Sequence, residues 1–321
     1  MSDQVLTGKH ISNRPMRILV TGVNGQLGHD VINELDRRGH VAIGSDITEE
    51  YAGMSDGSAV CEAPFVQLDL TDEKAVRRAI RLIRPQAVIH PAAWTAVDKA
   101  EDPAVKELVW AINAKAPGYL AAACAKVGAK MLYISTDYVF NGQGEEPWDP
   151  DCKEYAPISV YGASKLGGEL AVAGNLDKFF IVRIAWAFGK NGQNFVKTML
   201  KLSDTHPELR VVRDQIGTPT YTLDLARLLA DMIESDKYGY YHATNEGGFI
   251  SWADFAREIF RQAGKEVKVT PVTTEEYGLS AAARPFNSRL DKSKLMRAGF
   301  TPLPDWQDAL RRYLQEIEVI H

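Results

Sequence analysis

Residues 16–35 constrain the fold more than any other stretch of the chain. The apolar run Met16–Val20 is typical of a buried parallel strand, and it stops at Thr21-Gly22. Glycines follow at positions 22, 25 and 28, and apolar residues at helical spacing continue to Leu35. A strand, a glycine turn and a helix in this order form a dinucleotide-binding motif, because the glycines let the backbone approach a pyrophosphate at the positive end of the helix.

A second predicted strand, His40–Gly44, leads to a carboxylate. Asp46 lies about twenty residues beyond the last glycine, the spacing at which an acidic side chain accepts hydrogen bonds from a ribose. The alternative is that Asp46 caps a turn. Two more strands are predicted at Phe65–Leu68 and Ala87–His90, with a helix over Glu73–Ile83 between them. The sequence therefore predicts an α/β fold with a Rossmann-like, doubly wound parallel sheet.

Composition excludes several other kinds of protein. A net charge of −5 argues against a surface for nucleic acid or anionic membrane, and no apolar run reaches the length of about 18–20 residues that spans a bilayer. The first fifteen residues lack the apolar core of a signal peptide. Cys61, Cys124 and Cys152 are odd in number and widely spaced, which predicts free thiols in a reducing cytoplasm and no zinc site.

The spacing of Tyr161 and Lys165 is the strongest indication of chemistry in the middle of the chain. Four residues apart, they share one face of a helix, with Cβ atoms roughly 5–6 Å apart. A neighbouring ammonium is expected to lower the pKa of the phenol from about 10, so that the tyrosine exchanges a proton near neutral pH. The alternative is an ordinary surface helix that carries both residues, and only a nearby hydride carrier makes the pair significant.

Hydroxyl side chains precede this helix at the end of another predicted strand. Met131–Ile134 is followed by Ser135 and Thr136, at the edge where open α/β sheets bind ligands. We expect Thr136 to donate a hydrogen bond to a carbonyl oxygen that is being reduced, and local capping is the alternative. The segment Gly142–Pro157, rich in Pro, Asp and Glu, is predicted to form a loop over the site.

These features belong to a longer series of motifs. The motifs are Gly22–Gly28, Ala92–Glu101, Ser135–Phe140, Tyr161–Lys165, Arg183–Gly189, Asn194–Val196, Asp214-Gln215, Gly217–Thr220 and Arg284–Ser288. With them the chain resembles the extended short-chain dehydrogenases/reductases and, within that group, the dTDP-4-dehydrorhamnose reductase family, from about Met16 to the C-terminus. His90-Pro91 and Trp94 depart from the family's more usual Asn-Ala and Tyr.

The resemblance implies a reaction and a set of site residues. The reaction is the NAD(P)H-dependent reduction of dTDP-4-dehydro-L-rhamnose to dTDP-L-rhamnose, the last step of dTDP-rhamnose synthesis for cell-surface polysaccharide. Tyr161 would protonate the alkoxide, Thr136 would bind the oxyanion, and Lys165 would tune Tyr161. The expected cofactor contacts, from the motifs and the resemblance together, are Gly22, Asn24, Gly25, Gln26, Leu27, Gly28, Asp46, Asp69, Leu70, Ala92, Ala93, Tyr161 and Lys165. The expected substrate contacts are Thr95, Val97, Thr136, Asp137, Trp186, Asn194, Phe195 and Arg284.

Two of the expected substrate contacts have clear alternatives. Arg284 is the candidate to pair with the diphosphate, a task that suits a guanidinium, and a surface salt bridge is the alternative. By resemblance Trp186 packs near the deoxysugar, and a plain core tryptophan is the alternative.

The resemblance also implies how the chain is divided. Residues 1–15 would form a loosely ordered extension, 16–188 the NAD(P)-binding domain with 223–243 returning to it, and 189–321 a smaller substrate-binding lobe. Asp46 would repel a 2′-phosphate, which favours NADH, whereas the family commonly uses NADPH, so both cofactors are expected. Some members are dimers with Mg²⁺ at the interface and others are monomers; the sequence places no metal site and leaves a monomer or a homodimer open.

Two other functions fit the same scaffold. One is a nucleotide-sugar epimerase or dehydratase, although Asp137 is followed by Tyr138, where the dehydratases carry a glutamate. The other is a non-catalytic partner, because the regulatory subunit of methionine adenosyltransferase resembles these reductases and can retain their motifs.

Overall fold

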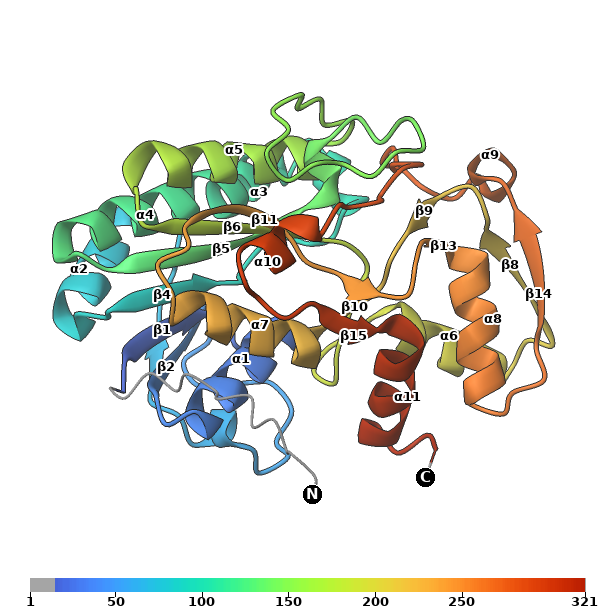
Figure 1. Ribbon diagram of the computed structural model, residues 1–321, viewed down its shortest axis with the longest axis horizontal. Helices are drawn as coiled ribbons and strands as arrows, with labels where there is room; N and C mark the ends of the chain where they lie inside the picture. The colour runs from blue at the N-terminus through green and yellow to red at the C-terminus, as the bar shows by residue number, and fades with distance from the viewer. Residues whose placement is uncertain (1–14, 321) are drawn as a thin grey trace, which may run out of the picture.

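The computed structural model describes residues 15–320, so residues 1–14 of the predicted extension lie outside the described part. A sheet of seven parallel strands forms the centre of the larger lobe, in the order β11-β6-β5-β4-β1-β2-β3 (Figure 1). Its strands are β1 (Arg17–Thr21), β2 (Val41–Asp46), β3 (Phe65–Gln67), β4 (Ala87–His90), β5 (Lys130–Thr136), β6 (Phe179–Ile184) and β11 (Gly239–His242).

The order of the strands reverses between β1 and β4. β1 pairs with β2 on one side and with β4 on the other, in parallel on both sides. In open α/β sheets ligands bind in the crevice outside the carboxyl ends of the strands at such a reversal. The predicted α/β fold with a doubly wound parallel sheet is confirmed, and its topology places the binding edge next to the glycine turn that follows β1.

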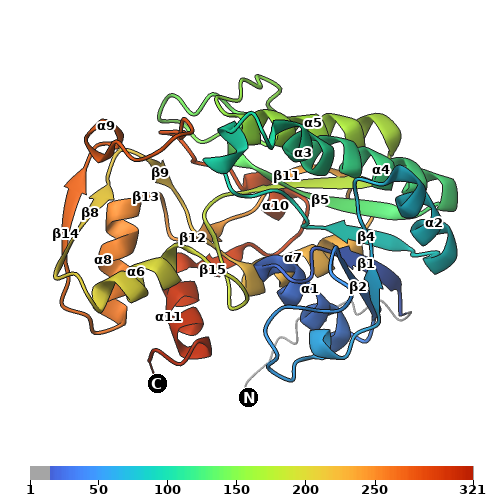
Figure 2. The same cartoon turned by 180° about the vertical axis from the view of Figure 1, so that it is seen from behind.

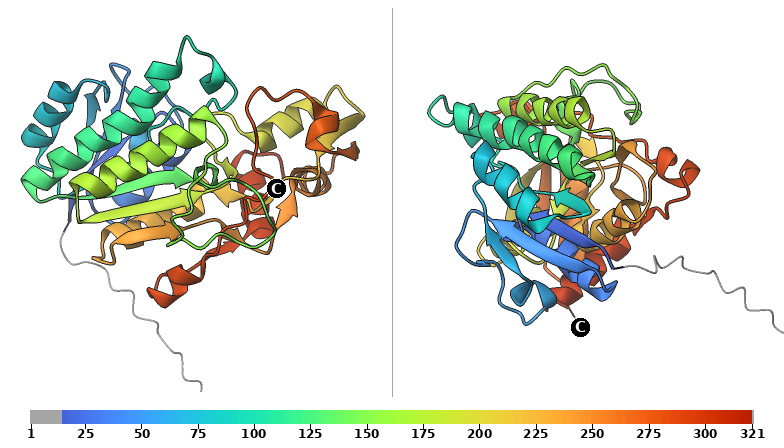
Figure 3. Two further views of the ribbon diagram at one scale, coloured as in Figure 1. Left: turned by 90° about the horizontal axis from the view of Figure 1, so that it is seen from above. Right: turned by 90° about the vertical axis from the view of Figure 1, so that its left-hand side faces the viewer.

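Helices cover both faces of the sheet, with α2, α4 and α5 on one face and α1 and α7 on the other (Figures 1 and 3). The helices of this lobe are α1 (Gln26–Arg37), α2 (Glu73–Ile83), α3 (Lys106–Trp110), α4 (Ala116–Val127), α5 (Val160–Asn175) and α7 (Thr222–Ile233). The helix predicted over Glu73–Ile83 is confirmed as α2, and Asp72 caps it by accepting from the N–H groups of Lys74 and Ala75. An apolar cluster lies on each face of the sheet.

The helical segment that precedes α4 is irregular. A π-helical turn, η3 (Ala111–Lys115), joins α3 to α4 and turns the buried side chain of Asn113 toward the loop after β4. There Asn113 accepts from the Trp94 N–H (2.8 Å) and donates to the Trp94 carbonyl (3.1 Å) and to Ser164 in α5 (3.0 Å). The π-turn therefore ties the loop at the binding edge to α5.

The smaller lobe contains its own apolar core. Helices and short strands surround it (Figure 2). In this lobe β8 (Glu208–Val212) and β14 (Lys268–Val272) pair in parallel over five residues each. Their half-exposed strands lie about sixty residues apart in sequence, so no local pattern shows the pairing. The helices are α6 (Phe195–Ser203), α8 (Trp252–Gln262), α9 (Thr274–Tyr277), α10 (Ser293–Arg297) and α11 (Trp306–Glu316).

Short strand pairs connect the two lobes and complete the smaller one. They are β7 (Ala187–Phe188) with β10 (Thr220–Tyr221), β8 (Glu208–Val212) with β14 (Lys268–Val272), β9 (Ile216–Gly217) with β13 (Ile250–Ser251), and β12 (Asn245–Glu246) with β15 (Leu303–Asp305). Three short 3-10 turns are η1 (Ala59–Cys61), η2 (Lys99–Glu101) and η4 (Asp137–Val139). Among the helices of residues 15–320, none has the length and apolar character needed to cross a membrane.

Candidate active site

A cleft of about 770 Å³ lies at the carboxyl edge of the large sheet, between the glycine turn and α5. It brings together most of the residues that the sequence singled out. These are Gly22, Asn24, Gly25, Gln26, Leu27, Gly28, Asp46, Ala92, Ala93, Thr95, Val97, Thr136, Asp137, Tyr161, Lys165 and Trp186.

The glycine turn forms one wall because no side chain fits there. Gly22 has a φ of +66°, and a Cβ on it would lie 2.7 Å from the Cα of Ala92 across the sheet edge. A Cβ on Gly28 would lie 2.3 Å from the Gly22 carbonyl oxygen, so this glycine allows α1 to begin directly against the turn. The resulting open backbone at the start of a twelve-residue helix fits the pyrophosphate of a dinucleotide.

Asp46 has the turn role that was the alternative in the sequence, and its contact with a ribose stays a prediction. Its carboxylate lines the cleft and accepts hydrogen bonds from the backbone N–H groups of Asn24 (3.0 Å) and Ile47 (2.8 Å). The carboxylate thus holds the glycine turn in place and also puts a negative charge at the end of β2. Among the described residues that line the cleft, Lys165 of α5 is the only lysine or arginine. No basic side chain of this lining therefore lies at the end of β2, where it could bind a 2′-phosphate.

Tyr161 lies in the first turn of α5, which Ser159 caps by accepting from the Gly162 N–H (3.1 Å). Its ring meets Tyr138 edge to face at 5.4 Å. Burial raises the pKa of the Tyr161 phenol above its ordinary value, a hydrogen bond with Thr136 opposes that rise, and the Asp137 carboxylate adds to it. The prediction that Lys165 lowers this pKa is wrong for the protein alone, because burial dominates.

Lys165 is buried beneath Tyr161, so the pair does not lie on an ordinary surface helix. Its ammonium donates to the Ile134 carbonyl (2.7 Å) at the end of β5 and lies 4.1 Å from the centre of the Tyr133 ring. Burial lowers the pKa of Lys165 to about 7, and the charge of Glu169 one helical turn later opposes that shift. The lysine is thus fixed at the floor of the cleft and titrates near neutral pH.

His90, at the end of β4, has a structural role. Its Nδ1 is 2.7 Å from the Thr21 hydroxyl, and its ring stacks on Tyr133 at 5.7 Å. Burial, with a smaller contribution from the charge of Lys165, lowers the pKa of His90 to about 3, so the imidazole is neutral. The ring therefore supports Tyr133, which in turn lies under the Lys165 ammonium.

A second cavity of about 290 Å³ adjoins the cleft on the side of the smaller lobe. Arg284 lines it and pairs with Asp98 at 2.6 Å, so the salt bridge considered from the sequence is present. However, its Nη1 is buried without a hydrogen-bond partner. A buried guanidinium nitrogen with no partner inside a cavity is suited to an anionic ligand.

Two stacked tryptophans separate the two cavities. Trp186 and Trp252 stack at 3.8 Å between ring centres, and both line both cavities. Trp186 has a φ of +52°, a conformation uncommon for a residue with a side chain, and Gly217 leaves room beneath its indole. Trp186 is half-buried, because it lines both cavities on one side and packs against a small apolar cluster on the other.

Four of the expected contacts do not line either cavity. Asp69 accepts from the N–H and hydroxyl of Thr71 and so closes a turn, while Leu70 packs on the apolar cluster beneath. Asn194 caps α6 and also donates to the Gln26 side chain (2.9 Å). Phe195 packs against Trp252 (4.6 Å) in the smaller lobe.

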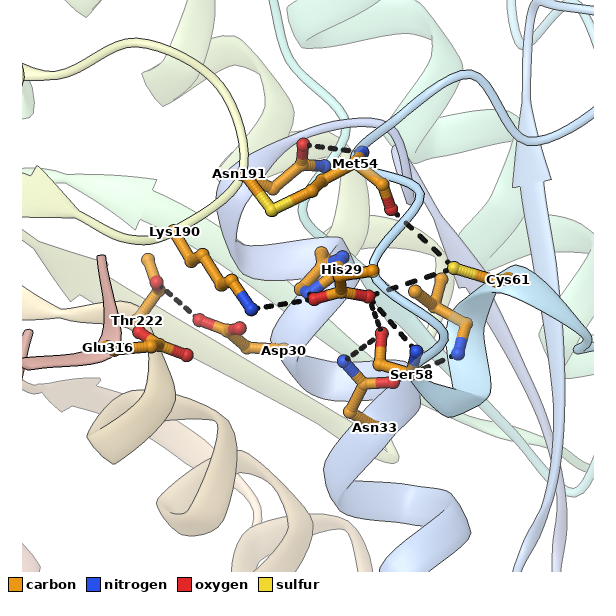
Figure 4. A network of polar contacts seen from close by, with 12 residues as sticks. His29, Asp30, Asn33, Met54, Ser58, Cys61, Lys190, Asn191, Thr222 and Glu316 are labelled. Atoms are coloured by element: carbon orange, nitrogen blue, oxygen red, sulfur yellow. Dashed lines mark hydrogen bonds and ion pairs between the residues drawn. The ribbon is translucent and has the colours of Figure 1, made fainter. Parts of the chain in front are cut away.

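The loop of residues 189–194 fastens the smaller lobe to the glycine turn. The Gly189 N–H donates to Gln26 (2.8 Å), and the Asn191 side chain donates to the Asn24 carbonyl (2.9 Å). Lys190 pairs with Asp56 at 2.8 Å, within the polar network of Figure 4. These contacts give Asn194 and Gln26 a positioning role.

The sequence reasoning missed several lining residues, which are Tyr138, Gln193, Gln215, Trp252 and Ser288. Ser288 ends the motif Arg284–Ser288, and Gln215 belongs to Asp214-Gln215, so both were within reach of the motif analysis. Trp252 had no such signal, because it directly follows a capping serine and resembles an ordinary first-turn residue.

A dinucleotide turn that faces a buried Thr136–Tyr161–Lys165 group at the edge of a doubly wound sheet defines the class of extended short-chain dehydrogenases/reductases. Within it, the chain belongs to the family described as RmlD substrate binding domain, which matches residues 16–319.

Relatives from several bacteria agree with this assignment. The chain is 42% identical to dTDP-4-dehydrorhamnose reductase of Streptomyces griseus, over 92% of this chain and 91% of that protein. A crystal structure of a dTDP-4-dehydrorhamnose reductase from Clostridium acetobutylicum has 42% identity and a TM-score of 0.85, covering 94% of this chain and 100% of that one. The enzyme from Bacillus anthracis, solved in complex with NADP, has 40% identity and a TM-score of 0.85 over the same shares of the two chains.

Proposed function

We propose that this protein reduces dTDP-4-dehydro-L-rhamnose to dTDP-L-rhamnose with NAD(P)H, the last step in making a sugar donor for cell-surface polysaccharide. One observation carries the proposal: Thr136, Tyr161 and Lys165 line the same cleft as the glycine turn. The adjoining cavity is lined by Arg284, whose buried Nη1 has no hydrogen-bond partner in the protein. The names of the relatives support the choice of substrate.

The residues present fit a nicotinamide dinucleotide. At Gly22 and Gly28 the backbone packs too closely for a Cβ, which keeps the turn tight, and the N-terminus of α1 favours phosphate there. Lys165 lies where an ammonium can donate to the hydroxyls of a ribose. When bound, the dinucleotide supplies the hydride.

On the substrate side, the protein's residues bind the ketosugar and supply a proton. Tyr161 donates its phenolic proton to the oxygen at C4 as charge develops there. Thr136, which is in hydrogen-bond contact with Tyr161, orients the same oxygen. Arg284 pairs with the diphosphate through the nitrogen that has no protein partner. Trp186 and Trp252 form the side of the binding site against which the sugar packs.

We also propose a place of action and a cofactor preference. Three free cysteines and a nucleotide-sugar substrate support a cytoplasmic enzyme, acting as a monomer or a homodimer. Asp46 and the lack of a lining cation at β2 support a preference for NADH over NADPH, with both accepted.

The test is the oxidation of each reduced cofactor by the purified chain with dTDP-4-dehydro-L-rhamnose, followed at 340 nm, with product identification by mass. We expect oxidation that depends on the ketosugar, and more efficient use of NADH. Elimination or epimerisation of the sugar without net oxidation would contradict the proposal, as would no turnover at all, which is the result for a purely regulatory subunit.

A further inference from the structure

The guanidinium of Arg284 is held at one terminal nitrogen and open at the other. Its Nη2 donates to Oδ2 of Asp98 (2.6 Å), whereas its Nη1 is buried without a hydrogen-bond partner. Arg284 lines the second cavity, and Asp98 lines neither cavity. Because a guanidinium is planar and rigid, holding one terminal nitrogen restricts where the other can point. The contact with Asp98 therefore sets the direction of the nitrogen that has no partner.

Asp98 also holds the backbone that carries Arg284. Its second carboxylate oxygen, Oδ1, accepts from the N–H of Ala282 (3.0 Å), two residues before the arginine. On the other side of the arginine, the backbone N–H of Asn287 donates to the Gly142 carbonyl (2.8 Å). The segment from Ala282 to Asn287 is thus tied to the larger lobe both before and after Arg284.

Asp98 itself has a fixed position in the larger lobe. It directly precedes η2, a turn in which Ala100 is fully buried. Glu101, the last residue of η2, accepts from the N–H of Val160 (2.8 Å), which is the first residue of α5. Tyr161 follows Val160 in that helix. The carboxylate of Asp98 is therefore positioned relative to the helix that carries the proposed proton donor.

We infer that Asp98 is a positioning residue for the sugar nucleotide, which aims the free nitrogen of Arg284 at the diphosphate. The inference rests on one part of the proposed function, the pairing of Arg284 with that group. Coulomb repulsion by itself predicts the opposite effect, because a carboxylate close to an anion-binding group weakens the binding of the anion. The two effects differ in sign, so removal of the Asp98 charge decides between them.

Asp98→Asn removes the charge and leaves one oxygen for two donors, so the contact with Arg284 or with Ala282 is lost. Because the Asp98 side chain is 45% exposed, the substitution should leave the fold intact. Titration calorimetry with dTDP should show a Kd about 5- to 20-fold higher than that of the unmodified protein. KM for dTDP-4-dehydro-L-rhamnose should rise by a similar factor, and kcat should change much less. A Kd for dTDP that is lower, or unchanged within about twofold, would overturn the inference.

Asp102→Asn is the matched control. Asp102 is exposed in the same segment, accepts from the Ala104 N–H (2.9 Å) and lines neither cavity. Its replacement changes the net charge by the same amount, so a long-range electrostatic effect would appear in both variants. We expect its Kd for dTDP to stay within about twofold of the unmodified value. Equal weakening in Asp98→Asn and Asp102→Asn would overturn the inference.

The double variant Asp98→Asn, Arg284→Met tests whether Asp98 acts through the arginine. With no guanidinium to position, the loss of Asp98 should not weaken dTDP binding further, so the two effects should not add. Additive effects would overturn the inference. Calorimetry with dTDP needs no turnover, so a protein that binds dTDP but oxidises no cofactor would reject the proposed reaction alone. An unmodified protein without affinity for dTDP would reject both the proposed function and this inference.

Discussion

The two walls of the active-site cleft are built in different ways. The cofactor wall comes mainly from short segments: a glycine turn, the ends of β4 and β5, and the first turns of α5. The substrate wall joins residues far apart in the chain, such as Arg284 with Asp98 and Ser288 with Asp137. Local sequence determines the structure of the cofactor wall. The substrate wall forms only because the smaller lobe packs against the larger one.

Different interactions hold the two walls in place. On the cofactor wall, steric exclusion fixes the backbone, since a Cβ at Gly28 would lie 2.3 Å from an oxygen. On the substrate wall, charge pairs and ring stacking hold side chains from two lobes together, as between Trp186 and Trp252. We therefore expect changes in the cofactor wall to affect every step, and changes in the substrate wall to affect mainly binding of the sugar nucleotide.

The largest effect on turnover is expected from Tyr161→Phe, because Tyr161 is the proposed proton donor between the cofactor and the sugar. Loss of the phenolic proton should lower kcat by about 10²- to 10⁴-fold while the Kd for NADH, measured by fluorescence, stays nearly unchanged. Tyr119→Phe serves as the matched control, because Tyr119 packs on the apolar cluster outside both cavities. Unchanged turnover in Tyr161→Phe would remove this residue from the acid role.

Gly28→Ala tests the steric character of the cofactor wall. The added methyl group would push α1 away from the turn, so we expect NADH binding to weaken at least about tenfold and the protein to lose roughly 1–3 kcal/mol of stability. Gly174→Ala, in α5 with no atom within 4 Å of the added Cβ, should instead stabilise by about 0.5–1 kcal/mol. Titration calorimetry and urea unfolding give both numbers, and equal NADH affinity in the two variants would contradict the steric account.

Arg284→Met tests the substrate wall. Removing a charge-assisted contact of about 1.5–3 kcal/mol should raise KM for the sugar nucleotide by about 10- to 100-fold, with a smaller change in kcat and none in the Kd for NADH. Arg257→Met is the control, because that arginine makes an exposed ion pair within α8. A drop in kcat alone, at unchanged KM, would show that Arg284 acts on the chemistry instead of the diphosphate.

The smallest effect is expected behind the cofactor wall, where α1, α7 and α11 meet (Figure 4). Asp30 in α1 is buried and accepts from Thr222 at the start of α7 (2.5 Å), with Glu316 of α11 close by. Burial raises the pKa of Asp30 to about 7, so the folded protein holds a proton there that the unfolded chain loses near pH 4. Stability from this group is therefore present at low pH and lost as pH rises from about 4 to 7.

Asp30→Asn imitates the protonated carboxyl and should remove this pH dependence. We expect its Tm to exceed that of the unmodified protein by a few degrees at pH 8 and to match it below about pH 4. Differential scanning calorimetry at several pH values measures both. The same difference at every pH would mean that ionisation of Asp30 does not cause the pH dependence.

The parts of the site that could be predicted from the sequence belong mainly to the cofactor wall. The spacing of the glycines, Asp46 and the Tyr161–Lys165 pair follows from geometry within single strands and helices, and these residues do line one cleft. Asp69 and Asn194 could not be placed in this way, because polar side chains at the ends of strands and helices also close turns and cap helices, as both do here. The pKa of Tyr161 was misjudged because burial, which depends on the whole fold, outweighs a neighbouring charge.

By itself the sequence determined the doubly wound sheet and the backbone of the dinucleotide turn, because hydrophobic periodicity and glycine sterics act over a few residues. Only the tertiary structure decided what surrounds each functional group. It buried Lys165 against Tyr133, stacked Trp252 on Trp186 and brought Ser288 to Asp137. Solvation and long-range contacts depend on every layer packed around a side chain, and no local pattern in the chain encodes them.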